Sequence, residues 1–524
     1  MITWRNGTVI ATRREWRGAL ELDVRVGETS VRALCYPAMT GEPAAGDRVL
    51  LNTTALDLGL GTGGYAMVVA LPDRLPPDAE LPGHLIKARY TPLQTCVQGA
   101  DEQDSPWHEV LRDATDIGGM PVVVADLHSA LPAVLAGLFS VSSELTVVYV
   151  MQDGGALPAW FSRSCSGLSD AGWLAGVVTT GQSFGGDLET VTLHTGLLAA
   201  RHVLNASVAV VTQGPGNLGT GTRWGYSGVA AGEAVNAAAA LGGRPVASLR
   251  VSSADARSRH YGVSHHSLTA YGRVALAPAD VVVPSLGDSL GGSLGGSLGG
   301  SLGGEFGGLV AEAAASLADR HRLVTVPVDG LEDALRASPV PLSTMGRGLD
   351  EDLAYFLAAA AAGAHAGRLA TDCRTRRLPI WWLRACRARL AGTSSHFRTV
   401  PAGPCRVRAG PAMIVGHRLR ISGIPGPRWL IRLARPCLGG RAGWCWREAC
   451  AGSDVSARPA PPRPGLAGTT CGNALSCGIT PRFGGSGPHE GLIQHVIRRG
   501  PARSGGIGTF CSGGAAGRSG PCAE

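Results

Sequence analysis

Residues 1–72 alternate hydrophobic and polar positions in short runs, which is the pattern of half-buried β-strands. The clearest run is Ala19-Leu-Glu-Leu-Asp-Val-Arg-Val. Further runs lie at 8–12, 30–36, 48–54 and 65–71, and glycine-containing turns separate them. Several short strands within so few residues predict a small β-barrel of SH3-like or OB-like type as the first domain.

From Pro121 the pattern changes to continuous valine-rich runs separated by helical stretches. The predicted strands are 121–125, 145–150, 174–179, 207–212, 245–251, 280–283 and 323–328. The predicted helices are 131–138, 188–204, 229–241, 266–276 and a final alanine-rich helix at 353–365. Apolar strands that alternate with helices indicate a parallel sheet covered on both faces. We therefore predict a doubly wound, mostly parallel α/β domain of Rossmann-like type over 121–366, preceded by a connecting segment at 73–120.

One stretch inside this domain is a repeat of low complexity. Ser289-Leu-Gly-Gly recurs in register up to Gly304, and near-copies flank it. Glycine at half of the positions makes an ordered conformation costly in entropy. Residues 285–308 are therefore predicted to be a flexible linker.

Composition divides the chain near Gly367. Residues 1–367 hold 23 arginines and lysines against 35 acidic residues, a net charge of −12, whereas 368–524 hold 24 arginines against 5 acidic residues, a net charge of +19. Ten of the 13 cysteines also lie in the second part, which shows no sustained apolar periodicity. We expect 368–524 to be disordered. Two interpretations of this basic tail stay open: unselected, out-of-frame translation of GC-rich DNA, or an extension that binds nucleic acid.

The residues before this tail predict a cytoplasmic protein. No apolar run is long enough to cross a bilayer, and the first residues lack the apolar core of a signal peptide. Cys35, Cys96 and Cys165 are widely separated and are interpreted as buried thiols rather than a disulfide set or a nucleophile. We expect no membrane partner, and no nucleic acid on the body of the protein, because the barrel has no stripe of arginine and aromatic residues.

Small, polar and titratable residues follow the predicted strands, where an open parallel sheet binds its ligands. Asp126 and His128 follow the first strand, Asp153 follows the second, and His265 and His266 lie beyond the fifth. Such residues suit acid–base catalysis or a metal site. Adjacent residues on a helix diverge by about 100°, so only one of the two adjacent histidines is expected to face the site. No spacing supports a particular metal, and structural hydrogen bonding is the alternative.

The loop after the fourth strand has the pattern G-x-G-x-x-G at Gly214, Gly216 and Gly219, and Arg223 follows it. Glycines allow backbone N–H groups to approach a phosphate, and arginine is a natural partner for an anion. The next helix begins several residues after the third glycine, and no carboxylate clearly ends the following strand. This favours an anionic ligand other than a dinucleotide, or a purely structural loop, and the cofactor stays unassigned.

The chain has 46 arginines but one lysine, Lys87. A Walker A loop and Schiff-base chemistry in the sheet therefore lack their residue. Lys87 has either survived the bias toward arginine by chance or occupies a position that requires a compact ammonium group.

Four strings together resemble a known family. They are Asp126-Leu-His-Ser-Ala-Leu-Pro, Gln213-Gly-Pro-Gly-Asn-Leu-Gly-Thr-Gly-Thr-Arg-Trp-Gly, Ser264-His-His-Ser-Leu-Thr-Ala-Tyr-Gly and Ser343-Thr-Met-Gly-Arg-Gly-Leu-Asp-Glu-Asp. They are similar to an uncharacterised bacterial family, the domain of unknown function 3866 family, over about residues 1–366. The resemblance implies no activity. The repeat and the basic tail depart from the family pattern.

Two hypotheses of function follow. In the first, Gly214, Gly216, Gly219, Arg223 and Asp153 bind an anionic or phosphorylated small molecule, and Asp126, His128, His265 or His266 supply proton transfer or hold a metal for a hydrolytic step. In the second, the protein is a non-catalytic sensor or adaptor that acts through its barrel. The sequence defines neither the substrate nor the oligomeric state.

Overall fold

The computed structural model describes residues 1–377 apart from 62, 79, 81 and 287–298, together with 420–423 and 429–432. Residues up to 377 belong to one compact unit. In a second unit, strands β20 (Arg420–Gly423) and β21 (Trp429–Arg432) form an antiparallel pair. No helix in the described part of the chain has both the length and the apolar character needed to cross a membrane.

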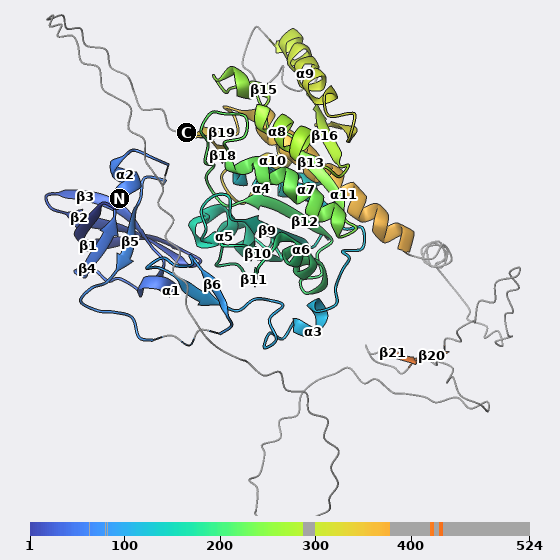
Figure 1. The fold of residues 1–524 in the computed structure, drawn as a ribbon. Helices are drawn as coiled ribbons and strands as arrows, with labels where there is room; N and C mark the ends of the chain where they lie inside the picture. The colour runs from blue at the N-terminus through green and yellow to red at the C-terminus, as the bar shows by residue number, and fades with distance from the viewer. Residues whose placement is uncertain are drawn as a thin grey trace, which may run out of the picture. The chain divides into compact units, whose positions relative to one another are not determined.

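The N-terminal strands close into the predicted barrel, in the order β1-β2-β3-β5-β4 (Figure 1). They are β1 (Trp4–Trp16), β2 (Ala19–Val26), β3 (Thr29–Cys35), β4 (Arg48–Asn52) and β5 (Ala66–Ala70), with short helices α1 (Pro37–Thr40) and α2 (Thr54–Asp57) between them. Alternate residues of β2, among them Leu22 and Val24, are fully buried inside the barrel. The alternation of the sequence is therefore the inside–outside alternation of the barrel wall.

One face of the barrel packs against the α/β domain. The indole Nε1 of Trp16 donates a hydrogen bond to the carbonyl oxygen of Trp160 (2.7 Å), and Arg17 pairs with Asp187 (2.5 Å). Tyr36 contacts the Trp160 ring, with ring centres 6.0 Å apart. The barrel is therefore joined to the α/β domain by aromatic and charged contacts.

The connecting segment contains the two-stranded sheet of β6 (Leu85–Lys87) and β7 (Thr95–Val97), followed by α3 (His108–Leu111). Lys87 at the end of β6 is fully buried. Its Nζ donates to the carbonyl oxygens of Gly181 (2.8 Å) and Ser183 (2.9 Å) and lies 3.3 Å from Oε2 of Glu189. The structure thus places the single lysine where a compact ammonium group binds three acceptors.

The second domain is built on an eight-stranded sheet in which every pair of neighbouring strands is parallel. The strand order is β11-β10-β9-β12-β8-β13-β16-β17. The strands are β8 (Pro121–Val124), β9 (Val147–Gln152), β10 (Gly176–Thr180), β11 (Leu188–Thr190), β12 (Val208–Gln213), β13 (Arg244–Ser248), β16 (Asp280–Ser285) and β17 (Arg322–Pro327). Seven of them coincide with predicted strands, and the doubly wound fold is confirmed.

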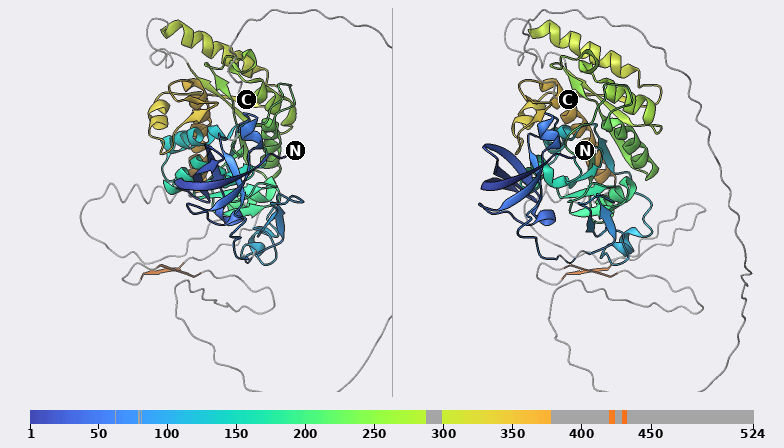
Figure 2. Two further views of the ribbon diagram at one scale, coloured as in Figure 1. Left: turned by 90° about the vertical axis from the view of Figure 1, so that its left-hand side faces the viewer. Right: turned by 60° about the vertical axis from the view of Figure 1, so that its left-hand side comes forward.

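Helices cover both faces of this sheet (Figures 1 and 2). On one face α11 packs against α4 and α10, and on the other α6 and α7 pack against the strands and against each other. The helices are α4 (Leu131–Val141), α5 (Arg163–Asp170), α6 (Leu193–His202), α7 (Ala230–Ala240), α8 (His265–Thr269), α9 (Gly299–Ala315), α10 (Leu331–Arg336) and α11 (Leu353–Arg377). Two short antiparallel strand pairs lie in the loops outside this sheet: β14 (Val251–Ser252) pairs with β15 (Gly262–Val263), and β18 (Ser343–Thr344) pairs with β19 (Arg347–Gly348).

The structure corrects two predicted helices. The predicted helix 188–204 is divided into strand β11 and helix α6, and the Thr192 side chain caps α6 by accepting from the Thr195 N–H. β-branched residues at this point favour extended backbone before the cap. The predicted helix 266–276 is short α8 followed by a π-helical turn, Ala270–Val274.

Two predicted boundaries also move. The sequence predicts a flexible linker over 285–308. From Gly299 onward the chain instead forms helix α9, whose Phe306 and Val310 are buried. Residues 287–298 lie outside the described part. Helix α11 continues beyond the predicted end at His365, and Leu369 and Ala370 belong to the core. The change in composition near Gly367 therefore falls inside a packed helix. The tail 368–524 is predicted from the sequence to be disordered. Apart from the end of α11 and strands β20 and β21, its residues lie outside the described part of the chain.

Candidate functional site

Three neighbouring strands, β12, β8 and β13, end at the same edge of the sheet. The chain leaves β8 toward α4 on one face and leaves β12 toward α7 on the other. Loops that depart to opposite faces leave a crevice at the strand ends, which is where ligands bind in this class of fold. Asp126 follows β8, Asn217 follows β12 and Arg250 follows β13, and Asn217 and Arg250 line the same pocket.

The glycine-containing loop after β12 is held by hydrogen bonds within itself. Asn217 Oδ1 accepts from Gln213 Nε2 (3.0 Å), Ser227 Oγ (3.2 Å) and the Gly228 N–H (3.4 Å). Gly216 has a φ of +92°, which favours glycine. A side chain at Gly214 would place its Cβ 2.2 Å from the Ala156 carbonyl oxygen. Gly214 and Gly216 therefore serve the shape of the loop.

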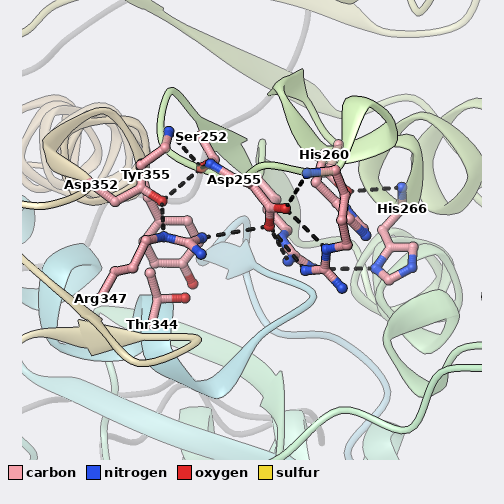
Figure 3. A network of polar contacts seen from close by, with 12 residues as sticks. Ser252, Asp255, His260, His266, Thr344, Arg347, Asp352 and Tyr355 are labelled. Atoms are coloured by element: carbon pink, nitrogen blue, oxygen red, sulfur yellow. Dashed lines mark hydrogen bonds and ion pairs between the residues drawn. The ribbon is translucent and has the colours of Figure 1, made fainter. Parts of the chain in front are cut away.

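His260, in the turn before α8, and His265 and His266, at the start of α8, form a cluster of three imidazoles (Figure 3 labels His260 and His266). The Ser264 side chain caps this helix by accepting from the His266 N–H, and its oxygen also lies 2.8 Å from His260 Nδ1. The ring of His266 stacks face to face on Tyr226, with centres 3.7 Å apart. One nitrogen from each histidine lies within 4.8 Å of the others.

Arginines and aspartates form a buried network beside the histidines (Figure 3). Asp255 Oδ2 lies 2.9 Å from Arg257, 3.5 Å from Arg347 and 3.9 Å from Arg250. Arg347 also contacts Asp352 (3.0 Å). The Ser252 hydroxyl donates to Asp352 (2.7 Å), which links β14 to the start of α11. The network fixes the positions of these arginines.

Burial makes the three histidines poor bases. Burial, together with the positive charge of Arg250, lowers the pKa of His260 to about 3 and that of His266 to about 2. Burial, with Arg259, also lowers the pKa of His265. All three imidazoles are therefore neutral at pH 7. Burial alone would raise the pKa of Asp255, but hydrogen bonds and charge from Arg257 hold it well below its usual range.

Asp126 behaves differently from Asp255. Its side chain is 4% exposed, and its Oδ2 atom is buried without a hydrogen-bond partner, 3.9 Å from His266 Nδ1. Burial raises its pKa, although the charge of Arg250 opposes the shift. An unsatisfied buried carboxyl oxygen is uncommon because it loses its hydration without compensation. Its presence marks Asp126 as a functional candidate.

Some of these residues line a small pocket at the strand ends. Its lining residues are Asn217, Gly219, Gly221, Arg250, Arg257, Arg259, His260, His266 and Met345. The pocket combines positive guanidinium groups with neutral imidazoles, so it can attract an anion and also offer imidazole nitrogens as ligands.

Comparison with protein families shows which family the chain belongs to. The family model described as a protein of unknown function (DUF3866) matches residues 32–363, more than half of the sequence. The chain belongs to the DUF3866 family. The DUF3866 match begins in β3, ends in α11 and includes every residue of the pocket, and it confirms the resemblance seen in the sequence. Comparison with curated proteins found no match.

Some predicted site residues meet in this DUF3866 pocket and others do not. Gly219 and His266 line it, and Asp126 and His265 are neighbours of His266 without lining the pocket themselves. Of the two adjacent histidines, His266 is a lining residue of the pocket and His265 is not, although both rings belong to the cluster with His260. Arg223 is exposed and is not a lining residue, although its charge contributes to the lowered pKa of His265.

Two predicted residues have structural partners elsewhere. His128 is buried, with Nδ1 3.0 Å from the Tyr149 hydroxyl and Nε2 2.7 Å from Ser162 Oγ. Asp153 accepts from the Gln182 N–H (3.0 Å) and so supports the loop after β10. Because both ring nitrogens of His128 are engaged away from the pocket, we do not assign it a catalytic role.

Sequence reasoning missed Arg250, Arg257, His260 and Arg347. The signal for Arg347 was present in the string Ser343–Asp352, which belongs to the family resemblance but carries no recognised chemical spacing. The other three lie in a loop after β13 that the sequence pattern left without a role. Only the fold brings this loop and β19 to the same aspartate.

Proposed function

We propose that this protein binds an anionic, phosphorylated small molecule in the pocket at the ends of β12, β8 and β13. The observation that carries the proposal is the group of arginines held in place around Asp255 and beside neutral imidazoles. Guanidinium groups bind phosphate oxygens through charge-assisted hydrogen bonds. Arginines positioned before the ligand arrives lose less side-chain entropy when it binds.

The charges near the pocket support the same ligand. Arg250, Arg257 and Arg259 line the pocket, and Asp255 holds Arg250, Arg257 and Arg347 together. A phosphate would bind to this group of guanidinium charges. Positive potential in a concave site also accelerates the capture of an anion.

Asp126, the candidate for proton transfer in a hydrolytic step, lies close to this anion site, next to the lining residue His266. Asp126 and His266 lie 3.9 Å apart, and the raised pKa of Asp126 suits a carboxyl group that exchanges a proton. We therefore propose hydrolysis of a phosphorylated compound as the reaction class. A cytoplasmic location belongs to the same proposal and is supported by Cys35 and Cys165, which are buried free thiols.

Binding of phosphate is the first test. Pyrophosphate, sugar phosphates and nucleotides are added to the full chain in a chelator-containing buffer, and the melting temperature and calorimetric affinity are measured. We expect stabilisation by at least one of them. Arg259→Gln should weaken its binding by ~10- to ~100-fold, because a hydrogen bond to a charged group contributes about 1.5–3 kcal/mol. Arg259 is exposed, so the fold should not depend on it.

Arg25→Gln is the matched control, since Arg25 is an exposed arginine of the barrel. Its affinity for the same compound should equal that of the wild-type protein. Equal weakening by both substitutions would show a general charge effect and would contradict a site at the strand ends. No stabilisation by any phosphorylated compound would overturn the proposed function.

The second hypothesis, an adaptor acting through the barrel, gains no specific support. The barrel face that carries Trp16 and Tyr36 is occupied by Trp160 of the same chain. This contact favours a structural role for that face. Action of the barrel as an adaptor stays a prediction from the sequence.

A further inference from the structure

We infer that His260, His265 and His266 form a binding site for a divalent transition-metal ion beside the anion pocket. The inference goes beyond the proposed function and does not require it. One nitrogen of each ring lies within 4.8 Å of the others. Nitrogens that share one Zn²⁺ lie about 3–4 Å apart, because each bond is about 2.0–2.1 Å long. Small side-chain rotations would therefore close the three rings on one ion.

The hydrogen bonds of two rings leave suitable nitrogens for the metal. His260 Nδ1 is engaged by Ser264 Oγ at 2.8 Å, so Nε2 is its remaining nitrogen. His265 Nε2 is buried without a hydrogen-bond partner. A buried imidazole nitrogen that forms no hydrogen bond has lost its hydration without compensation. A metal ion at this nitrogen would supply the missing partner.

A carboxylate, that of Asp126, lies near the ring of His266. In metal sites a carboxylate commonly accepts a hydrogen bond from the histidine nitrogen that does not bind the metal. Asp126 Oδ2, also without a hydrogen-bond partner, lies 3.9 Å from His266 Nδ1, and Arg250 Nη1 lies 3.3 Å from the same nitrogen. Binding of a metal through Nε2 requires the ring proton on Nδ1. That proton would then face Asp126 and replace the Arg250 contact. A carboxylate that accepts from the outer nitrogen orients the ring and strengthens its bond to the metal.

The neighbouring arginines indicate what else binds at such a site. Arg250 and Arg257 would repel a cation on its own, although Asp126 and Asp255 offset part of this repulsion. An anion bound between the metal and the arginines would reduce this repulsion further. Imidazole ligands suit Zn²⁺, Co²⁺, Ni²⁺ and Fe²⁺ better than Mg²⁺ or Ca²⁺. We therefore expect a transition metal, bound more tightly when phosphate is present.

Titration with Co²⁺ tests this site in the full chain. The thiols are first blocked with iodoacetamide, because thiolates also bind cobalt, and the buffer contains no phosphate. We expect visible absorption bands that saturate at one equivalent of cobalt. His265→Ala should abolish them, and His265→Gln provides a second variant of similar size if the alanine protein is poorly folded by circular dichroism.

Two further variants make the result specific. His194→Ala removes an exposed histidine of α6 and should leave the bands unchanged. Asp126→Asn should weaken cobalt binding by about 10- to 100-fold, the usual cost of removing a carboxylate behind a histidine ligand. The inference is overturned if the wild-type protein shows no bands, or if the His265 variants bind as the wild type does. Either result leaves the phosphate measurement, made in chelator, unaffected.

Discussion

Replacing Gly363 with alanine is expected to destabilise the protein by about 3 kcal/mol, the upper end of the cost of overpacking a core. In α11 a Cβ at this position would lie 2.0 Å from the Val134 carbonyl oxygen of α4. The reciprocal position on α4, Gly137, would bring a Cβ 1.9 Å from the Ala360 carbonyl oxygen. The two backbones are thus in direct contact. Chemical unfolding followed by circular dichroism measures the loss.

Gly308→Ala in α9 is the matched control for this substitution. Gly308 is a helical glycine whose added Cβ would meet nothing within 4 Å. Alanine should stabilise the helix there by roughly 0.5–1 kcal/mol, because glycine loses more backbone entropy on folding. If both substitutions change the free energy of unfolding in the same direction, the close contact of α4 and α11 is not what sets the cost.

Lys87→Met should destabilise the protein by about 3–5 kcal/mol, because it leaves the buried Glu189 without its counter-ion. The ammonium group also satisfies the carbonyl oxygens of Gly181 and Ser183. Burial lowers the pKa of Lys87 and raises that of Glu189, so their charges depend on each other. Thermal and chemical unfolding of the full chain measure the effect.

Two variants separate this ion pair from general effects of the segment. Arg89→Met changes an exposed cation two residues away and should alter the free energy of unfolding by no more than about 0.5 kcal/mol. Adding Glu189→Gln to Lys87→Met should recover part of the loss, because the unpaired charge is removed. A Lys87→Met protein as stable as the Arg89→Met protein would show that the ammonium group contributes nothing.

The sequence predicted the architecture because local patterns report burial directly. Alternation in Ala19–Val26 and continuous valines in Pro121–Val124 reflect one-sided and two-sided burial of strands. The same reasoning missed β11, since three residues are too few to establish a period. It also ended α11 too early, because burial of Leu369 and Ala370 depends on packing rather than on composition.

The candidate site was only partly predictable. Asp126 and His266 were expected because residues that follow parallel strands share one edge of the sheet. His128 satisfied the same rule, yet its ring bonds to Tyr149 and Ser162 instead. The position of a residue in the sequence predicts where its backbone lies at the sheet edge. The direction of its side chain depends on which neighbouring groups can form hydrogen bonds with it.

The sequence by itself thus determined the barrel, the parallel sheet and the edge at which polar residues gather, since each depends on hydrophobic periodicity or strand order. Tertiary structure alone decided that Arg257 and Arg347, far apart in the chain, share Asp255. It also decided that Asp126 keeps an oxygen without a hydrogen bond beside His266. The physical reason is that hydrogen bonding and charge compensation act over a few ångströms in space, whatever the separation in sequence.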